Sequence, residues 1–359
     1  MPESFLSFYN QDMHILLVRF SSMGDVVLTT ATINWLHSLL GNDLTISFVT
    51  SQEFTSLLTN HPGVKTVIGF DRKNGEKWSD LIKKIEVVDD QNPVDLIIDL
   101  HATLRSLRLR FSFFMVPALT IDKRRWERFL LTKIRSVKLK KFFSVEPQVV
   151  RVLKDLEAIF QDTRAVRRTE EFRKGPHGEL TSLGGHVQQK LTRPYITLAP
   201  SASFTYKRWH IDSYMELVRE LLAKTDNDIV ILAGPADNFC EVFDTLKSDR
   251  VHNLQGKTSL IESMEYLKGA KLTVGNDSGL NHISEAYGVP CVTLFGPTDP
   301  RFGFAPHGRD SVTISRDLWC KPCSTTGSKD CYRDRHYCME EIKVKEVLDA
   351  SLLVLGRAL

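Results

Sequence analysis

Short polar loops follow several apolar runs in this sequence, and the first of them carries a carboxylate. The loop Ser21-Ser22-Met23-Gly24-Asp25 comes directly after the run from His14 to Phe20. Gly24 permits a tight turn and the close approach of another molecule, and Asp25 falls at the start of a helix. The helix dipole stabilises a charged carboxylate there, so Asp25 is predicted to be available as a base. The alternative is that Asp25 only caps the helix.

A second loop, Pro200 to Trp209, places hydroxyl groups before two cations, Lys207 and Arg208. Hydroxyl donors and positive charge together suit a diphosphate. A solvated surface loop is the alternative interpretation. The residues predicted to contact the ligand are Ser201, Ser203, Thr205 and Lys207.

The third loop, Val274 to His282, runs from a strand through small polar residues into a helix. Exposed backbone N–H groups at such a helix start form an anion site. The loop matches neither a Walker A motif nor G-x-G-x-x-G, so neither an NTPase nor a nicotinamide enzyme is favoured. A fourth loop, Phe295 to Pro300, has the turn residues of a rigid wall, or of a plain turn. The predicted ligand contacts of the third loop are Asp277, Ser278, Gly279 and His282, of which His282 is expected to be supporting, not catalytic.

Four of the six cysteines lie close together near the C-terminus: Cys320, Cys323, Cys331 and Cys338. Four thiolates can satisfy tetrahedral zinc, but only the first pair has the C-x2-C spacing. We rank unligated cysteines first, a structural zinc site second and a disulfide third.

The segment from Arg105 to Lys141 is strongly basic, with 12 Lys or Arg against 2 acids, and aromatic residues lie between the charges. Its excess of positive charge is far above the +3 of the whole chain. Such a surface suits an anionic, partly apolar partner such as a lipid surface. A solvated helix face and RNA binding are the alternatives. The strand end from Asp99 to Arg105 is predicted to line a binding site, through His101 and Arg105, or to be an ordinary turn.

Length and composition set the frame for these loops. With 359 residues, 42% of them hydrophobic, the chain can bury two cores of ordinary size, so two domains are expected. The ordinary charge content argues against a disordered chain or a general nucleic-acid binder. The first residues do not read as a signal peptide, and no apolar run is long enough to span a bilayer, so a cytoplasmic protein is expected.

Alternating strand and helix patterns place each loop after a strand. In the first half, strands are predicted at 14–20, 44–49, 64–70 and 94–100, with helices at 25–40, 52–59 and 76–88. After Pro194 the pattern restarts, with strands at 195–199, 228–233, 271–275 and 290–295. Such alternation implies parallel sheets covered on both faces, whose ligands bind beyond the carboxyl ends of the strands. The charged, Gly-rich stretch 161–193 is the predicted linker, which gives domains of residues 1–180 and 181–359, the second with the Cys-rich segment 320–338 and a C-terminal helix.

Taken together, the motifs Ser21 to Asp25, Lys207-Arg208-Trp209, Gly275 to His282 and Gly296 to Pro300 resemble glycosyltransferase family 9. This family includes the ADP-heptose:lipopolysaccharide heptosyltransferases. The resemblance runs from about His14 to Asp299. It implies a GT-B fold, in which two Rossmann-like doubly wound domains face a central cleft. It also implies acceptor contacts mainly in the first domain and the nucleotide sugar mainly in the second.

Residue by residue, the resemblance implies that Asp25 is the base, Lys207 the phosphate-contacting lysine and Asp277-Ser278-Gly279 the donor-binding turn, followed by His282. Ser22 and Gly24 join His101 and Arg105 on the acceptor side. The sequence departs from the family at Thr30-Ala31, where a proline is usual, and at Asn276, where small or apolar residues are common. The acid that contacts the ribose is not matched; Asp237 or Glu241 is the candidate.

The resulting hypothesis is an inverting glycosyltransferase that requires no metal cofactor and moves heptose from ADP-heptose to a lipopolysaccharide inner-core acceptor. It would work in the cytoplasm, with peripheral contact to the inner membrane and no nucleic-acid partner. The alternatives are a family 9 enzyme for another nucleotide sugar and a nonenzymatic binder of nucleotide or anionic lipid. A zinc-dependent interaction module at the tail is a further alternative.

Overall fold

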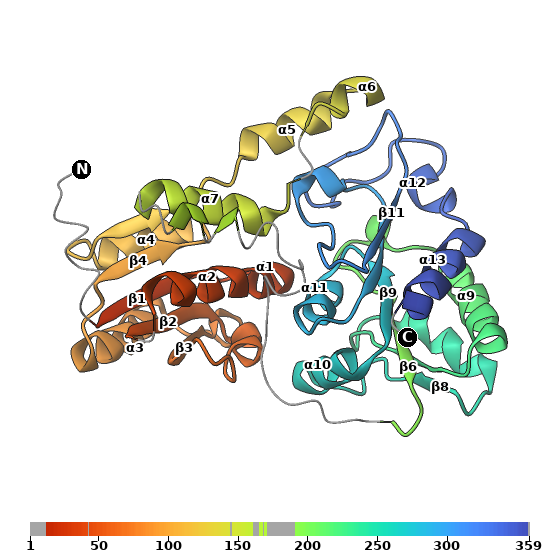
Figure 1. Ribbon diagram of the computed structural model, residues 1–359, viewed down its shortest axis with the longest axis horizontal. Coiled ribbons are helices and arrows are strands. Elements are labelled where there is room, and N and C mark those ends of the chain that lie inside the picture. Colours follow the sequence, from red (N-terminus) through yellow and green to blue (C-terminus); the bar gives the residue numbers. More distant parts are fainter. Residues whose placement is uncertain are drawn as a thin grey trace. The chain divides into compact units, whose positions relative to one another are not determined.

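The computed structural model describes residues 12–41, 43–143, 146–160, 165–167, 169–170 and 191–357 of the chain. By their contacts they fall into two compact units, shown in Figure 1. Of the described residues, the first unit holds those within 12–123 and 149–170, and the second holds those within 124–148 and 191–357. The predicted domain boundary between residues 180 and 181 lies outside the described residues.

A parallel sheet of five strands in the order β3-β2-β1-β4-β5 forms the centre of the first unit. Strand β1 is buried along nearly its whole length because helices cover both faces, as a parallel sheet requires. The strands are β1 (Met13–Val18), β2 (Leu44–Ser51), β3 (Thr66–Phe70), β4 (Leu96–Asp99) and β5 (Ala118–Thr120). The helices are α1 (Met23–Leu28), α2 (Thr30–Leu40), α3 (Trp78–Gln91), α4 (Leu104–Ser112) and α7 (Gln148–Phe160), with 3-10 turns η2 (Gln52–Leu57) and η3 (Arg72–Asn74).

The single helix predicted over 25–40 is wrong, because two helices, α1 and α2, meet at Thr29. The hydroxyl of Thr29 donates to the carbonyl of Val26 at 2.5 Å, and that of Thr30 donates to Val27 at 2.7 Å. Side-chain donors of this kind compete with the backbone ladder of a helix. The helix that carries Asp25 is therefore only six residues long.

The second unit has a parallel sheet of six strands in the order β11-β10-β9-β6-β7-β8. Helices α9 and α13 pack on one face, and α10 and α11 pack on the other (Figure 1). The strands are β6 (Tyr195–Ala199), β7 (Asp228–Ile231), β8 (Val251–Asn253), β9 (Leu272–Asn276), β10 (Cys291–Phe295) and β11 (Val312–Ser315). The helices are α9 (Ile211–Lys224), α10 (Leu260–Gly269), α11 (Gly279–Ala286), α12 (Tyr337–Glu340) and α13 (Val344–Arg357), with 3-10 turns η5 (Thr205–Lys207), η6 (Asn238–Leu246) and η7 (Pro300–Phe302).

Helices α5 (Arg125–Lys133) and α6 (Val137–Lys140) belong to the second unit, although their sequence lies within the first half of the chain. The ammonium of Lys140 donates to the carbonyls of Trp319 and Lys321, and the backbone N–H of Gln148 donates to Gly303. The domain predicted for residues 1–180 included this segment. The basic stretch from Arg105 to Lys141 is thus divided, with α4 in one unit and α5 and α6 in the other.

The strand orders explain why the polar loops carry the site. In each sheet the chain starts in the middle and winds outward in both directions, which confirms the predicted doubly wound architecture. The order reverses between β1 and β4 in the first unit and between β6 and β9 in the second. Ligands of such sheets bind beyond the carboxyl ends of the strands at this switch point. The loops of Asp25 and His101 follow β1 and β4, and those of Lys207 and Asp277 follow β6 and β9.

Candidate functional site

In the first unit, both carboxylate oxygens of Asp25 have partners. Asp25 is the third residue of α1, and Ser22 is its N-cap. The backbone N–H and the hydroxyl of Ser22 donate to Oδ2 of Asp25 at 3.1 and 2.8 Å. The guanidinium of Arg19 lies 2.6 Å from Oδ1. Asp25 therefore caps its helix and also presents a carboxylate that is 22% exposed, so the two interpretations do not exclude each other.

The surroundings keep Asp25 ionised. Burial by itself raises its pKa, but the positive charge of Arg19 and the two hydrogen bonds from Ser22 outweigh burial and hold the pKa of Asp25 below its ordinary value. Opposite charge and donated hydrogen bonds both favour the charged form of a carboxyl group. At neutral pH the group is a carboxylate that can receive a proton.

Arg19 is a residue of this site that the sequence analysis did not identify. Its guanidinium donates to the carbonyl of Ser21 at 2.9 Å and to the carbonyl of Leu100, which fixes it between the loops after β1 and β4. The sequence analysis placed Arg19 inside the first predicted strand, whereas β1 ends at Val18 and leaves Arg19 at the start of the loop. The predicted turn at Gly24 is wrong, because Gly24 lies buried inside α1.

His101 is a neutral histidine at the same switch point. Burial, helped by the nearby cations with Arg19 foremost, lowers the pKa of His101 to about 3. The carboxylate of Asp99 accepts the backbone N–H groups of His101 and Ala102 at 2.9 and 2.8 Å, which fixes the turn. Within the described part of the chain, Nδ1 of His101 has no hydrogen-bond partner. The imidazole can therefore donate or accept a hydrogen bond to a bound hydroxyl without carrying charge.

A pocket of about 540 Å³ opens beyond the ends of β1, β2 and β3 in the first unit. Of the four residues predicted on the acceptor side, only Arg105 lines this pocket; Ser22, Gly24 and His101 do not. Ser21, the neighbour of Ser22, also lines it. Three cations and two acids make its wall strongly polar, which suits an anionic ligand rich in hydroxyl groups. The lining residues include Ser51, Gln52, Glu53, Asp71, Arg72, Lys73 and Asn74.

In the second unit, three of the predicted loops meet around one carboxylate. The ammonium of Lys207 lies 2.8 Å from Oδ2 of Asp277, and the hydroxyl of Thr298 donates to the same oxygen at 2.8 Å. Lys207 follows β6, Asp277 follows β9 and Thr298 follows β10. Residues almost a hundred positions apart therefore converge because their strands are neighbours in the sheet. Thr298 was assigned to the wall of the site by sequence, and the structure gives it a specific contact.

The start of α11 offers hydrogen-bond donors beside this ion pair. Ser278 is the N-cap of α11, which begins at Gly279. The hydroxyl of Ser278 is buried and has no hydrogen-bond partner among the residues that the structure describes. His282, one turn into the helix, contacts the ring of Phe304 edge-on at 6.5 Å between centroids. Lys207, the Ser278 hydroxyl and the free backbone N–H groups of the helix start form a combination that binds phosphate oxygens.

Two residues predicted to touch the ligand bind each other. Oδ2 of Asp237 accepts the hydroxyl of Ser201 at 2.6 Å and the backbone N–H of Gly234 at 2.9 Å, and Arg208 lies 3.2 Å from its other oxygen. Asp237 thus holds two loops together, and its contact with a ribose stays a prediction. Ser203 and Thr205 are exposed in the loop that leads to Lys207.

Asn276 fixes the loop that carries Lys207, although by sequence it was only a departure from the family pattern. Its side chain is fully buried. Its carbonyl oxygen accepts the backbone N–H of Trp209 at 3.0 Å and the hydroxyl of Tyr214 at 3.3 Å, and its amide donates to the carbonyl of Pro200 at 2.7 Å. Both ends of the loop from Pro200 to Trp209 are therefore tied to the end of β9.

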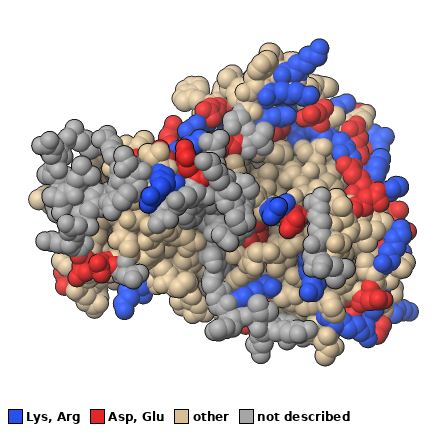
Figure 2. Space-filling model, viewed as in Figure 1, with Lys and Arg blue, Asp and Glu red and all other residues tan. Residues whose placement is uncertain are grey.

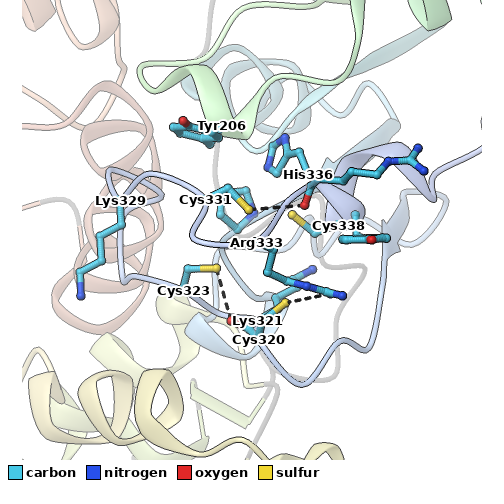
Figure 3. Close-up of a pocket in the computed structure, with 12 residues that line it drawn as sticks. Tyr206, Cys320, Lys321, Cys323, Lys329, Cys331, Arg333, His336 and Cys338 are labelled. Carbon is cyan, nitrogen blue, oxygen red and sulfur yellow. Dashed lines mark hydrogen bonds between the residues drawn. The ribbon is translucent and has the colours of Figure 1, made fainter.

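The four clustered cysteines line one small pocket, shown in Figure 3. All are free thiols, and burial raises the pKa of Cys338 to about 12 and also raises that of Cys323. In the described part of the chain, no three His, Cys, Asp or Glu side chains are arranged to hold a metal ion. Structural zinc at this cluster stays a prediction.

The segment from Trp319 to Cys338, called here the cysteine loop, also contacts residues predicted to bind phosphate. The backbone N–H of Cys323 donates to the carbonyl of Pro297 at 3.0 Å, next to Thr298. Gly327 has a left-handed backbone (φ 79°), and a Cβ added there would lie 2.6 Å from Cγ of Lys207. The side chain of Lys207 is thus packed between this loop and Asp277.

The chain is similar to known proteins along most of its length. The family model "Glycosyltransferase family 9 (heptosyltransferase)" matches residues 90–332. Lipopolysaccharide heptosyltransferase 1 of Pseudomonas aeruginosa is 24% identical over 331 residues, which cover 87% of this chain and 86% of that protein. Lipooligosaccharide heptosyltransferase 2 of Campylobacter jejuni serotype O:6 is 31% identical over 159 residues, so the chain matches only about half, 49%, of that relative.

Solved structures show the same fold. The ADP-heptose lps heptosyltransferase II of E. coli matches with a TM-score of 0.69 and 21% identity, over 96% of this chain and 99% of that one. A glycosyl transferase family 9 protein from Veillonella parvula matches with a TM-score of 0.70 and 16% identity, over 97% and 98% of the two chains. The predicted GT-B architecture of two Rossmann-like units is thereby confirmed.

Proposed function

Because the chain belongs to glycosyltransferase family 9, we propose that it transfers heptose from ADP-heptose to an acceptor in the lipopolysaccharide inner core. The relative from Pseudomonas aeruginosa, which matches both halves of the chain, is named a lipopolysaccharide heptosyltransferase. The solved E. coli relative is named for ADP-heptose. Another nucleotide sugar is the alternative donor.

The meeting of Lys207, Asp277 and the start of α11 is the observation that carries this proposal. The 2.8 Å ion pair keeps the ammonium in place until a diphosphate competes with Asp277 for it. The Ser278 hydroxyl and the first N–H groups of α11 add further donors. A single well-aimed donor to developing negative charge is typically worth roughly 2.7–4 kcal/mol in the transition state. We propose that these donors stabilise the leaving diphosphate without a required metal ion.

In the proposed reaction, the acceptor hydroxyl oxygen attacks the anomeric carbon of the sugar from the side opposite the diphosphate. The bond from carbon to the acceptor oxygen forms as the bond to the diphosphate oxygen breaks, so the configuration inverts and ADP leaves. The hydroxyl proton passes to Asp25. Since a carboxylate is a much weaker base than an alkoxide, the proton must move as the new bond forms. Neutral His101 can orient the hydroxyl through a hydrogen bond.

We further propose that the polar pocket beside Arg105 receives the acceptor. Its cations fit the phosphates and sugar carboxylates of an inner-core lipid. Such an acceptor belongs to a membrane, so the chain would work at the cytoplasmic face of the inner membrane through peripheral contact. Among the described helices, none is long and apolar enough to cross a membrane.

A product assay tests the proposal. Mass spectrometry of reactions with a panel of nucleotide sugars and inner-core acceptors should detect heptose transfer from ADP-heptose. Transfer from a different nucleotide sugar alone would correct the donor, and donor binding without any transfer would support a nonenzymatic binder.

Two variants test the assigned residues. Asp25→Asn should abolish turnover and keep donor binding, and Lys207→Ala should weaken donor use. Glu262→Gln is the matched control for Asp25, because Glu262 accepts the N–H and hydroxyl of Ser259 at the start of α10, each at 2.8 Å, in the same capping arrangement. Activity like the wild type in Asp25→Asn, or equal losses in both capping variants, would refute the base.

A further inference from the structure

The segment of α5 and α6 carries a concentration of positive charge that the proposed chemistry does not use. From Arg124 to Phe142 there are 8 Lys or Arg and a single acid, Glu127. Glu127 pairs with Arg124 at 3.6 Å, so this single acid does not neutralise the other Lys and Arg side chains of the segment. In Figure 2, Lys and Arg side chains gather over this segment with uncharged side chains between them. The exposed cations include Arg125, Lys133, Arg135, Lys138 and Lys141.

The same segment exposes large apolar side chains, which folded proteins normally bury. Trp126 is 83% exposed and Phe142 is 85% exposed. Contiguous exposed apolar side chains within a polar rim mark an interaction site. We call the exposed cations and apolar residues of α5 and α6 the docking platform; its other apolar members are Phe129, Leu130 and Leu139.

The platform is fixed to the second unit and extended by aromatic rings of the cysteine loop. The buried ammonium of Lys140 holds the end of α6 on the carbonyls of Trp319 and Lys321. The guanidinium of Arg135 lies 5.3 Å from the ring centres of both Trp319 and Tyr332. Trp319 and Tyr332 are themselves about half exposed. The apolar residues are therefore presented on a supported surface rather than on a loose helix.

We propose that this platform docks the second unit on an anionic lipid bilayer. Cationic side chains contact the lipid phosphates, and exposed Trp, Tyr, Phe and Leu side chains enter the boundary between headgroups and acyl chains. Each Lys or Arg near an anionic membrane surface adds to binding, and the apolar side chains add burial. The pattern is that of a segment that lies on a membrane.

The positive charge of the platform favours an anionic bilayer over a second copy of the chain as its partner. A second copy would bring the same cationic surface, and like charges at close range repel each other. An anionic bilayer instead complements the charge and also takes up the apolar side chains. The phosphate backbone of RNA offers negative charge, but RNA has no apolar layer to take up Leu130 and Leu139.

Docking through this platform specifies the peripheral membrane contact proposed above, and its role in the cell rests on that proposed function. It assigns the contact to the unit that holds Lys207 and Asp277, not to the unit of the acceptor pocket. The unit with the phosphate-binding residues would thus be held at the surface where a lipid-linked acceptor resides.

Vesicle flotation of the full chain tests the platform. The probes are vesicles of phosphatidylcholine alone and of phosphatidylcholine mixed with phosphatidylglycerol, at low and high salt. We expect binding to the anionic vesicles at low salt and little binding to the neutral ones. Replacing Lys133, Lys138 and Lys141 together by Gln should lower the partition onto anionic vesicles by on the order of 100-fold. Trp126→Ala with Phe142→Ala should lower it by on the order of tenfold or more.

Matched controls are available in the same unit. Gln at Lys224, Lys271 and Lys345 changes the net charge equally away from the platform, and Ala at the exposed Ile261 and Leu353 removes apolar surface elsewhere. Equal binding to neutral and anionic vesicles, or equal losses in platform and control variants, would overturn the proposal. Self-association lost in the platform variants, or RNA binding in place of vesicle binding, would also overturn it.

Activity measurements separate this inference from the proposed function. With a detergent-dispersed acceptor, the platform variants should turn over like the wild type, because none of the replaced residues is among those assigned to the donor or to the acceptor pocket. Vesicle binding without any sugar transfer would refute only the proposed function. Transfer without vesicle binding would refute only the docking platform.

Discussion

Replacing Gly327 by Ala should reduce donor use without touching any group that contacts the donor. The backbone there is left-handed, with φ at 79°, and the added Cβ would lie 2.6 Å from Cγ and 2.8 Å from Cδ of Lys207. Real contacts are never this short, so the lysine must adopt another rotamer. Its ammonium then leaves Asp277, from which it now lies 2.8 Å away. The predicted phosphate site around Asp277 and the start of α11 would then lose the positive charge that Lys207 holds in place.

The expected magnitude has two separable parts. An alanine in the left-handed region costs roughly 1–2 kcal/mol of folding free energy. Misplacing a group by about 1 Å can cost on the order of 100-fold in rate, so kcat/KM for the donor should fall by up to that factor. Gly288→Ala is the control, because Gly288 has φ at 75° and open space around the added Cβ. It should show the same loss of stability and an unchanged donor KM.

The assays are urea unfolding and initial rates at varied donor concentration. If Gly327→Ala matches Gly288→Ala in both stability and donor KM, the packing of the cysteine loop against Lys207 has no functional effect. A larger loss of activity in Gly288→Ala would show that backbone strain alone explains the result. Either outcome would refute the reasoning.

Three further predictions concern residues buried within one unit or the other. In Arg19→Met, burial is no longer opposed by positive charge, so the pKa of Asp25 rises and the acid limb of the pH profile of kcat/KM moves to higher pH; an unmoved limb would contradict the pairing. Asn276→Leu leaves several buried partners unpaired and should cost about 2 kcal/mol or more in urea unfolding and raise the donor KM, and unchanged values would show that the clamp is dispensable. Since burial raises the pKa of Cys338 to about 12, this thiol should stay unreactive toward a thiol reagent at pH 8 until the chain unfolds. One equivalent of zinc in elemental analysis would instead establish a metal site.

Much of the fold could be predicted because its signals are local. Apolar runs of strand length alternating with amphipathic helices report a parallel sheet whichever residues surround them, and both halves of the chain show this pattern. The polar loops after these runs could be chosen for the same reason, since ligands bind where parallel strands end. Asp25, Lys207 and Asp277 were therefore chosen from the sequence as candidate site residues, and the strand order places the last two together.

Other features depend on contacts that sequence spacing does not report. The guanidinium that pairs with Asp25 also donates to the carbonyl of Leu100, 81 residues from Arg19, and Asn276 clamps a loop that begins 76 residues earlier in the chain. Helices α5 and α6 join the second unit because Lys140 and Gln148 find carbonyl groups there, although their sequence neighbours belong to the first. Sequence by itself determined the chemistry available at each strand end. Only the tertiary structure decided which of these groups meet, because long-range hydrogen bonds and ion pairs form between residues that packing, and not spacing, brings together.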